Sequence, residues 1–431
     1  MTEGASRRPL LAGRVLAIAA IVLLAANLRT AVASLSPILH EVQADVPLGP
    51  TTVGLLGMLA PLSFAAFALL TPVLANRVGL EASAVLALVA LALGLAGRGI
   101  ATEPWVLVAT SAVAFASIGI GNALLPPLVK RYFPDRVGLM TSVYVAILAV
   151  STLVPPLVAV PVAGAAGWRV SLGLWAGVVI AALVPWIALL ARSRRRAEPH
   201  PGDGPVGPSV GPSTGDASAG SVAGDVGDRV DPVGLRHAFA SPLAWWIATM
   251  LAVSALNVYT LFAWLPELLA ETAGTGAAAN GALLALYAGV GAPAGIIVPI
   301  VAARTGRIGL LTGIGIACFV VGDLGLLLAP GTATWLWVAF AGLGPLTFPL
   351  ALVLINLRTR THAGAVVLSG FVQSVGYLIA AVFPLLIGVL HGATDGWTVP
   401  LLVLLATSVP LAFAGAAASR PRFLEDGRPA A

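Results

Sequence analysis

Long apolar runs separated by short polar turns cover most of this chain. A membrane-spanning helix needs roughly 20 mostly apolar residues, and with that length as a guide the pattern predicts twelve spanning helices. They are expected near residues 14–38, 51–75, 82–101, 105–128, 138–160, 168–191, 240–268, 278–302, 309–329, 334–355, 365–390 and 397–418. Because the loops are short, consecutive helices should be antiparallel neighbours. The expected fold class is an all-α membrane protein.

Residues 197–235 interrupt this pattern. They are rich in Gly, Pro, Ser and Asp and show no apolar periodicity, as in the stretch 201–205. Such a segment cannot bury enough apolar surface to offset its ordering entropy, so we predict a flexible linker. The expected division is a six-helix bundle at 1–191, a linker at 192–238, a second six-helix bundle at 239–418 and a tail at 419–431.

The two sets of six helices resemble each other in sequence. Residues 71–79 align without gaps on 298–306, and the basic loop 130–138 corresponds to 356–364. The offsets between the matching segments are 227 and 226, and the pair Asn27 and Thr30 recurs as Asn257 and Thr260 at an offset of 230. A nearly constant offset predicts two parallel repeats related by an axis along the membrane normal.

Composition excludes a water-soluble fold. The chain is 58% hydrophobic and only 10% charged, whereas a soluble domain carries about 25% charged residues. Its net charge of +5 does not indicate a nucleic-acid partner, because the basic residues lie at helix ends. We expect the partners to be the lipid bilayer and a small-molecule substrate, and the chain to be a monomer.

The basic residues also predict an orientation. If the N-terminus is cytoplasmic, all but three of the 23 Lys and Arg residues fall on the inner side, as the positive-inside rule requires. The exceptions are Arg29, within the first helix, and Arg98 and Arg169, which are expected on the outer side. We therefore predict a multi-pass protein of the plasma (inner) membrane with both termini cytoplasmic.

An alternative applies to the N-terminus. Residues 6–8, the apolar run after them and the sequence 31–33 resemble a twin-arginine export signal with its cleavage site. The recurrence of 27–30 in outline at 257–260 favours a permanent first helix, since a removable leader has no reason to share a pattern with the middle of the chain.

Three stretches carry a resemblance to a known family. They are 27–29 with Ser34, Pro37 and Leu39; 124–131 with 133–141; and 348–352 with 368–370, 373–377 and 396–397. With them the sequence resembles the major facilitator superfamily, in particular its cyanate-permease and 2-nitroimidazole-transporter (CynX/NimT) branch. The likeness covers all twelve helices and fails only in the linker. It implies the major facilitator fold and alternating-access transport of a small anion or small nitrogen-containing solute, cyanate-, nitrite- or nitroimidazole-like, without a cofactor.

The sequence also departs from general patterns of that superfamily. Asn76 replaces the acidic residue usual between the second and third helices, and Leu80 and Glu81 replace a basic pair. The fifth helix contains Pro155 and Pro156 in place of the glycine-rich signature of drug–proton antiporters. These differences argue against multidrug antiport. Efflux of neutral drug-like compounds remains the alternative function, and a proton is an open candidate for the coupling ion.

Arg29 is the strongest candidate for substrate binding. A charge within a membrane span costs several kcal/mol unless it faces a cavity or a partner. Its guanidinium offers forked donors to an anion, a nitro group or a cyanate-like group. The alternatives are a structural ion pair with Asp323 or Glu267, or extension of the side chain to the outer surface.

Other polar residues form stripes on predicted helices. Asn27, Thr30 and Ser34 share one face of the first helix, and Asn257, Thr260 and Trp264 repeat that face on the seventh. The candidate substrate-binding residues are Arg29, Asn27, Thr30, Asn257, Tyr259, Thr260, Trp264, Tyr287, Gln373 and Tyr377. Hydrogen bonding between helices is the alternative role for the Asn and Thr residues, and packing is the alternative for the others.

Charged residues at the cytoplasmic turns are candidates for gating contacts: Arg77, Arg304, Lys130, Arg131 and Asp135. Asp323 lies within the ninth helix, where proton coupling and a structural hydrogen bond are both open. Enzyme motifs are missing from the sequence, since His40-Glu41 lacks the second histidine of a zinc-protease motif and no Gly-x-x-x-x-Gly-Lys loop occurs. A polytopic membrane enzyme would also need titratable groups clustered at one depth, so we predict a transporter and no enzyme.

Overall fold

The computed structural model describes residues 14–197, 236, 238–360 and 362–427, and within these ranges it contains helices and no strand. The first group of helices is α1 (Val15–Asn27), α2 (Thr30–Ala33), η1 (Ser36–Ile38), α3 (Leu39–Asp45), α4 (Pro50–Val78), α5 (Leu80–Gly99), α6 (Pro104–Tyr132), α7 (Val137–Ala166) and α8 (Trp168–Ala197). The second group is α10 (Pro242–Ala273), α11 (Ala277–Val290), α12 (Ala294–Thr305), α13 (Ile308–Leu328), α14 (Thr334–Leu343), η2 (Gly344–Leu346), α15 (Thr347–Leu357), α16 (His362–Thr394), α17 (Thr398–Ala406), α18 (Ser408–Ser419) and η3 (Leu424–Gly427). Most of the predicted linker and the residues before 14 lie outside the described ranges.

Twelve segments of the described chain are long and apolar enough to cross a membrane, which confirms the twelve predicted helices. Four of these spans are built from more than one helix: α1 to α3, α11 with α12, α14 with α15, and α17 with α18. Several helices are longer than predicted. For example, α8 continues to Ala197 and α4 to Val78.

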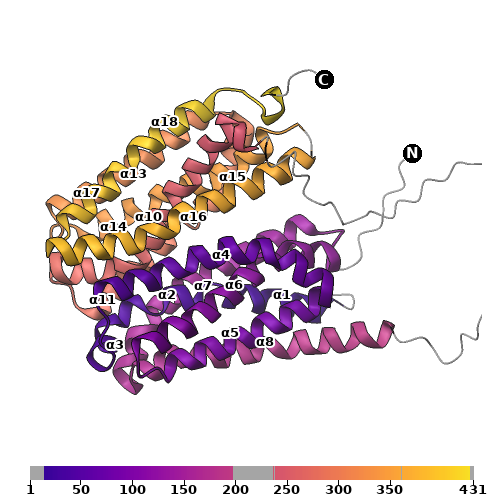
Figure 1. The fold of residues 1–431 in the computed structure, drawn as a ribbon, viewed down its shortest axis with the longest axis horizontal. Coiled ribbons are helices and arrows are strands. Elements are labelled where there is room, and N and C mark those ends of the chain that lie inside the picture. Colours follow the sequence, from indigo (N-terminus) through magenta and orange to yellow (C-terminus); the bar gives the residue numbers. More distant parts are fainter. Residues whose placement is uncertain (1–13, 198–235, 237, 361, 428–431) are drawn as a thin grey trace, which may run out of the picture.

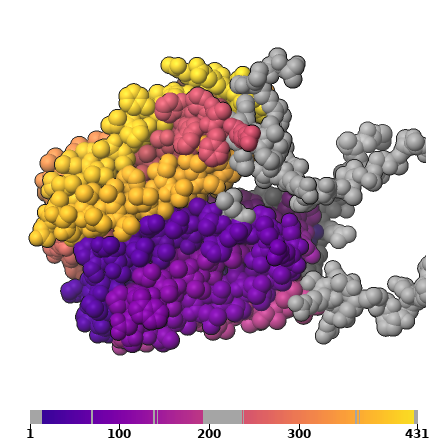
Figure 2. Space-filling model, viewed as in Figure 1, coloured from indigo at the N-terminus to yellow at the C-terminus, as the bar shows by residue number. Residues whose placement is uncertain are grey.

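The helices form two groups that lie side by side (Figure 1). Helices α1 to α8 make the lower group in that view and α10 to α18 the upper group, and the described chain begins at α1 and ends after α18 at the same end of the molecule. Figure 2 shows the two groups in contact at the end away from the termini.

The buried apolar residues explain where the two groups pack most closely. One core lies wholly within α1 to α8. The other runs through the second group and also takes in Ile38, Val53, Leu107 and Trp168 of the first group. These four residues lie at the helix ends opposite the chain termini, so a single continuous apolar core joins the two groups at that end.

Two contacts between the groups repeat the same arrangement. A Cβ atom on Gly54 of α4 would lie 2.7 Å from the carbonyl oxygen of Pro384 on α16, and one on Gly281 of α11 would lie 2.7 Å from the carbonyl oxygen of Pro156 on α7. Only glycine permits so close an approach of two backbones. Gly54 and Gly281 are 227 residues apart, so the sequence repeat extends to the packing between the groups.

The helix ends within the aligned segments 71–79 and 298–306 are also alike. Gly79 (φ +90°) follows α4 and Gly306 (φ +62°) follows α12. Their amides donate to the carbonyl oxygens of Ala75 and Ala302 at 2.9 and 3.0 Å. Positive φ favours glycine at helix C-termini, which accounts for the glycine shared by the two segments.

The first spans of the two groups differ. The span predicted near 14–38 is confirmed as Val15–Asp45, but it is not one continuous helix: α1 stops at Asn27 and the chain resumes as α2, η1 and α3. The Thr30 hydroxyl donates to the Asn27 carbonyl oxygen at 3.0 Å, and Pro37 lacks the amide hydrogen that a continuous helix would use. Its counterpart α10 continues through the corresponding positions.

Candidate functional site

Three aromatic rings meet where the two groups of helices face each other. Phe64 comes from α4, Tyr259 from α10 and Tyr377 from α16. The ring centroids of Phe64 and Tyr259 are 6.0 Å apart, and each of these rings is 6.4 Å from that of Tyr377. All three pairs meet edge to face, a favourable geometry for aromatic rings. We call Phe64, Tyr259 and Tyr377 the aromatic triangle.

Arg29 lies beside this triangle, in the turn between α1 and α2. Its guanidinium carbon is 5.9 Å from the centroid of the Phe64 ring, within the range of a cation–π contact. Its Nη1 is 3.4 Å from the Leu28 carbonyl oxygen, a long hydrogen bond. Within the described ranges it has no carboxylate partner; neither Asp323 nor Glu267 pairs with it. The arginine is half-buried and holds its charge without a counter-ion from the described chain.

Arg98 lies in the last turn of α5. This agrees with its predicted place near the end of the third helix, and its exposed fraction is 0%. Its Nη1 donates to the carbonyl oxygen of Ala31 at 2.7 Å, and its guanidinium carbon is 5.9 Å from the Phe115 ring centroid. Its Nε and Nη2 are buried and make no hydrogen bond to any described residue. Arg98 is therefore a second cation that lacks an acidic partner in the described chain, and this one is fully buried.

A cavity of about 40 Å³ lies beside Arg98 and Tyr259. Arg98 and Phe115 line it from the first group, and Tyr259 and Phe262 line it from the second. Ala31 and Ser36, on either side of the end of α2, complete one wall. Guanidinium donors beside aromatic rings can bind a small planar group with negative charge or with oxygen and nitrogen acceptors.

The two asparagines of the predicted stripes make the same local bond. The amide nitrogen of Asn27 donates to the Leu23 carbonyl oxygen at 2.8 Å, and that of Asn257 donates to the Val253 carbonyl oxygen at 2.9 Å. Both side chains are buried, and both Oδ1 atoms lack a described hydrogen-bond partner. Thr260 is also buried, and its hydroxyl makes no hydrogen bond with the described chain. None of these residues lines the cavity beside Arg98.

Three further candidates form hydrogen bonds within the second group. The Trp264 indole N–H donates to the Pro384 carbonyl oxygen at 2.9 Å. The Tyr287 hydroxyl is 3.4 Å from the Asn257 carbonyl oxygen. The Gln373 amide donates to the Ser369 hydroxyl at 2.8 Å along α16. Of the ten candidate residues, the structure brings together Arg29, Tyr259 and Tyr377.

Two of the five gating candidates have partners, and these lie within the first group. Arg131 Nε is 3.0 Å from an oxygen of the buried Glu81, which also accepts the Tyr132 hydroxyl. Asp135 pairs with Arg14 at 2.6 Å, and this hydrogen bond holds the pKa of the Asp135 carboxyl below its usual value.

The other gating candidates are Arg77, Arg304 and Lys130. Arg77 and Arg304 lie in the last turns of α4 and α12, and Lys130 in the last turn of α6. The structure gives them no ion pair with a described residue. Their position at helix ends agrees with the sequence, and their gating role stays a prediction.

Arg98, Phe64 and Phe348 are site residues that the sequence did not single out. Phe348 on α15 extends the aromatic triangle, with its ring centroid 6.3 Å from that of Tyr377. Arg98 offered a signal, because it falls inside the predicted helix 82–101. Phe348 falls within the stretch 348–352 that carries the family resemblance, but that resemblance assigned it no role. Phe64 lies in an apolar run, and nothing in the sequence distinguishes it from its neighbours.

Comparison with known proteins identifies relatives over most of the chain. The sequence profile of the Major Facilitator Superfamily matches residues 15–384. An uncharacterized transporter, YycB, of Bacillus subtilis (strain 168) is 30% identical over 412 residues, covering 94% of each chain. The 2-nitroimidazole transporter of Escherichia coli (strain K12) is 30% identical over 95% of this chain and 96% of its own. The cyanate transport protein CynX of the same organism is 25% identical over 88% and 90%.

Solved structures share the arrangement of helices. The crystal structure of the nucleoside transporter NupG covers 94% of this chain and 99% of its own, with a TM-score of 0.70 and 11% sequence identity. At that identity the likeness concerns the fold alone.

Proposed function

Because the chain belongs to the major facilitator superfamily, and is thus a multi-pass membrane transporter and not an enzyme, we propose that it carries a small planar anion or nitrogen-containing solute. Cyanate, nitrite and nitroimidazoles represent this class. The solute binds between the two groups of helices and reaches each side of the membrane in turn as the groups rock against each other. The 2-nitroimidazole and cyanate transporters among the relatives support this substrate class.

The observation that carries the proposal is the pair of arginines without carboxylate partners. Removing one partner of a buried ion pair typically costs about 3–5 kcal/mol, because the remaining charge is uncompensated. Arg98 is fully buried, and two of its nitrogens have no hydrogen-bond partner in the described chain. Arg29 lies in the break between α1 and α2. An anionic or strongly polar solute between them would supply the missing acceptors.

The aromatic triangle accounts for the preference for a planar solute. Its rings come from both groups of helices, so a solute in contact with all three would touch both halves at once. A flat ring or a linear anion can lie against aromatic faces and edges at little cost in shape. Arg29 above Phe64 provides the charge at the same place.

Efflux of neutral drug-like compounds is the second candidate function. The aromatic triangle alone would suit such compounds. However, a neutral apolar solute would leave the guanidiniums of Arg29 and Arg98 uncompensated, so the anion is the better fit.

We also propose that both chain termini lie on the cytoplasmic side of the inner membrane and that the protein is closed on the outer side. In this orientation, the continuous core that joins the two groups lies at the outer end. Helix contacts such as Gly54 on Pro384 then close the outer side. The pairs Arg131–Glu81 and Arg14–Asp135 brace the inner end of the first group.

Paired ligands that differ in charge and not in shape test the substrate class. Purified protein is titrated calorimetrically with nitrite, cyanate and benzoate, and with benzamide as the neutral counterpart of benzoate. We expect at least one anion to bind, and benzoate, if it binds, to bind about tenfold or more tighter than benzamide, because a charge-assisted hydrogen bond contributes about 1.5–3 kcal/mol. Equal affinity for charged and neutral members, or binding of neutral drug-like compounds only, would contradict the proposal.

A further inference from the structure

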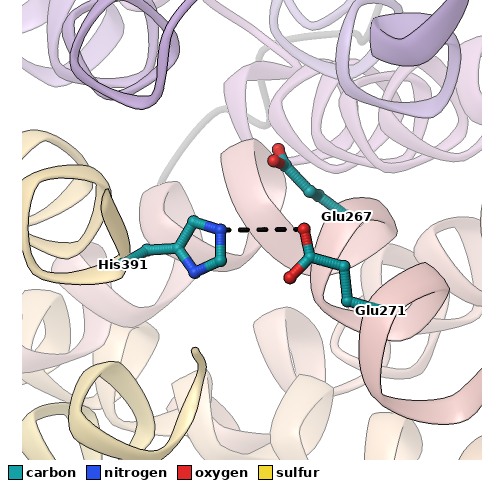
Figure 3. A group of neighbouring side chains, drawn as sticks. All are labelled: Glu267, Glu271 and His391. Atoms are coloured by element: carbon teal, nitrogen blue, oxygen red, sulfur yellow. Dashed lines mark ion pairs between the residues drawn. The ribbon is translucent and has the colours of Figure 1, made fainter. Parts of the chain in front are cut away.

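Two carboxylates and an imidazole meet at the end of the second group opposite the chain termini. Glu267 and Glu271 lie on α10 and His391 on α16, and one ligand atom from each lies within 4.8 Å of the others. Figure 3 shows the Glu271 carboxylate facing the imidazole and the Glu267 carboxylate directed toward the same space. From this geometry we infer that Glu267, Glu271 and His391 form a binding site for a divalent transition-metal cation such as Zn²⁺.

The histidine is oriented for metal binding. Its Nδ1 is 3.4 Å from the Gly396 carbonyl oxygen, and its ring stacks on that of Trp397 with centroids 4.2 Å apart. A hydrogen bond from Nδ1 to a carbonyl leaves Nε2 with a free lone pair, which is the usual arrangement of a metal-bound histidine. Nε2 is the atom that faces Glu271, at 3.7 Å from Oε1.

A hydrogen bond also orients the Glu271 carboxylate. Its Oε2 accepts the indole N–H of Trp397 at 2.7 Å, so Oε1 remains available toward His391. Ligands of a tetrahedral Zn²⁺ site lie about 2.0–2.2 Å from the metal, which places neighbouring ligand atoms about 3.3–3.6 Å apart by the tetrahedral angle. The observed 3.7 Å between Nε2 and Oε1 is close to that separation.

Glu267 provides an independent reason to expect a cation. Its Oε2 is buried and makes no hydrogen bond within the described chain. Glu267 and Glu271 are four residues apart on one helix face, where two like charges destabilise the helix. A divalent cation would give the buried oxygen a partner and remove the repulsion.

The surroundings favour a cation over an anion. A cavity of about 380 Å³ adjoins the cluster and is lined by Glu267, Glu271, Glu41 and His40 among others, with no Lys or Arg among its described lining residues. One oxygen of Glu41 is also buried without a described hydrogen-bond partner. The mixed carboxylate and imidazole ligands suit Zn²⁺ and related ions better than Mg²⁺ or Ca²⁺, which prefer oxygen ligands alone.

The site would join α10 to α16 next to a contact between the two groups of helices. A Cβ atom on Gly388 of α16 would lie 2.6 Å from the Pro50 carbonyl oxygen of α4 and 2.6 Å from the Trp264 ring. A bound cation would thus fix the position of α16 one turn away from this contact. The inference concerns metal binding and does not depend on the identity of the transported solute.

Metal binding to the purified full chain tests the inference. The protein, freed of metal with a chelator, is titrated with Zn²⁺ by calorimetry and with Co²⁺ by absorption spectroscopy. We expect one ion per chain, and affinities at least about tenfold weaker in Glu267→Gln, Glu271→Gln and His391→Gln, since even loss of a supporting residue costs 10–100-fold in metal affinity. Melting temperatures without metal report whether each variant is folded.

Glu103→Gln is the matched control. It makes the same change at an exposed glutamate before α6, outside the cluster and its cavity, so its affinity for Zn²⁺ should stay within about threefold of the wild type, since exposed charges contribute little. Failure of the wild-type chain to bind Zn²⁺ or Co²⁺ would overturn the inference. So would unchanged binding in all folded cluster variants, or a loss in Glu103→Gln as large as theirs.

Discussion

The first span of each half has the same local bond and then a different course. Asn27 and Asn257, at an offset of 230, each donate to the carbonyl oxygen four residues earlier. Beyond this point α1 ends and Arg29 occupies the turn, whereas α10 continues as an unbroken helix with Tyr259 at the corresponding position. One half thus offers a charge and an interrupted backbone, and the other an aromatic ring on a continuous helix.

The third span of each half shows a second difference of this kind. At the offset of 227 that relates Gly54 to Gly281, Arg98 of α5 corresponds to Gly325 of α13. The Trp337 ring fills the space beside Gly325 so closely that a Cβ atom there would clash with it. The repeats therefore share the packing that holds the halves together and differ in the residues proposed to bind the solute. The first half provides the cations, and the second half provides two of the three rings of the aromatic triangle.

Removal of the Arg98 charge should give the largest effect. Arg98→Gln is expected to weaken binding of the transported anion about tenfold to a hundredfold, because a hydrogen bond to a charged group contributes about 1.5–3 kcal/mol. Calorimetric titration with the anion measures this. Arg192→Gln, which removes an exposed arginine near the end of α8, should bind like the wild type. Full affinity in a folded Arg98→Gln would mean that the difference between Arg98 and Gly325 concerns packing only.

Equivalent substitutions at the two glycine contacts between the halves should have equal effects. Gly54→Val and Gly281→Val each place a side chain against a proline carbonyl of the other half, and overpacking of this kind costs about 1–3 kcal/mol. We expect both variants to loosen the contact between the halves and to speed maleimide labelling of a cysteine introduced by Ser36→Cys. The native Cys318 is buried, which keeps the background low.

Gly177→Val on α8 is the control for this pair, because a Cβ atom there meets no other atom within 4 Å. It should leave the labelling rate unchanged. If one of the two interface variants strongly increased the labelling rate and the other left it unchanged, the two contacts between the halves would not be equivalent.

Substitution of the two threonines should affect stability differently in the broken first span and in the continuous helix α10. Thr30→Val removes a hydrogen bond to the Asn27 carbonyl oxygen and should destabilise the protein by about 0.5–1.5 kcal/mol. Thr260→Val removes a buried hydroxyl that has no described partner and should be neutral or stabilising. Melting temperatures of the two variants check this, and equal destabilisation would contradict the account of the break in the first span.

The smallest expected effect is a pH dependence at the Arg14–Asp135 ion pair of the first half. The bond from Arg14 lowers the pKa of Asp135, so its stabilisation is fully present above the unfolded pKa of about 3.9 and is lost as pH falls through the folded value. The corresponding position in the second half, 361, is Thr. The difference in melting temperature between wild type and Asp135→Asn should shrink as pH falls below about 4. A constant difference from pH 3 to 7 would argue against this ion pair.

The number and order of the helices were predictable because the bilayer imposes a direct requirement on sequence. Each span must be apolar over its length and must bond its own backbone, so the apolar runs alone locate twelve spans. The repeat was also visible, since residues such as Gly79 and Gly306 are required by the same backbone conformation in both halves.

The site was only partly predictable, because it depends on contacts between distant segments. Arg29, Tyr259 and Tyr377 were identified as polar residues in apolar runs. The break of the first span was missed, since a single hydroxyl bond and a proline decide it locally. Phe64 was missed because the sequence does not show which apolar side chains face another helix and which face lipid.

The most direct test of the account is the affinity of two Arg29 variants for the transported anion, measured together with their melting temperatures on the same preparations. We predict that Arg29→Lys, which keeps the charge and loses the planar fork, weakens binding partly, and that Arg29→Gln weakens it about tenfold to a hundredfold. Both variants should remain folded, since Arg29 has no carboxylate partner in the described chain to strand. Unchanged affinity in a folded Arg29→Gln would remove Arg29 from the site and contradict the central claim that an anion binds there.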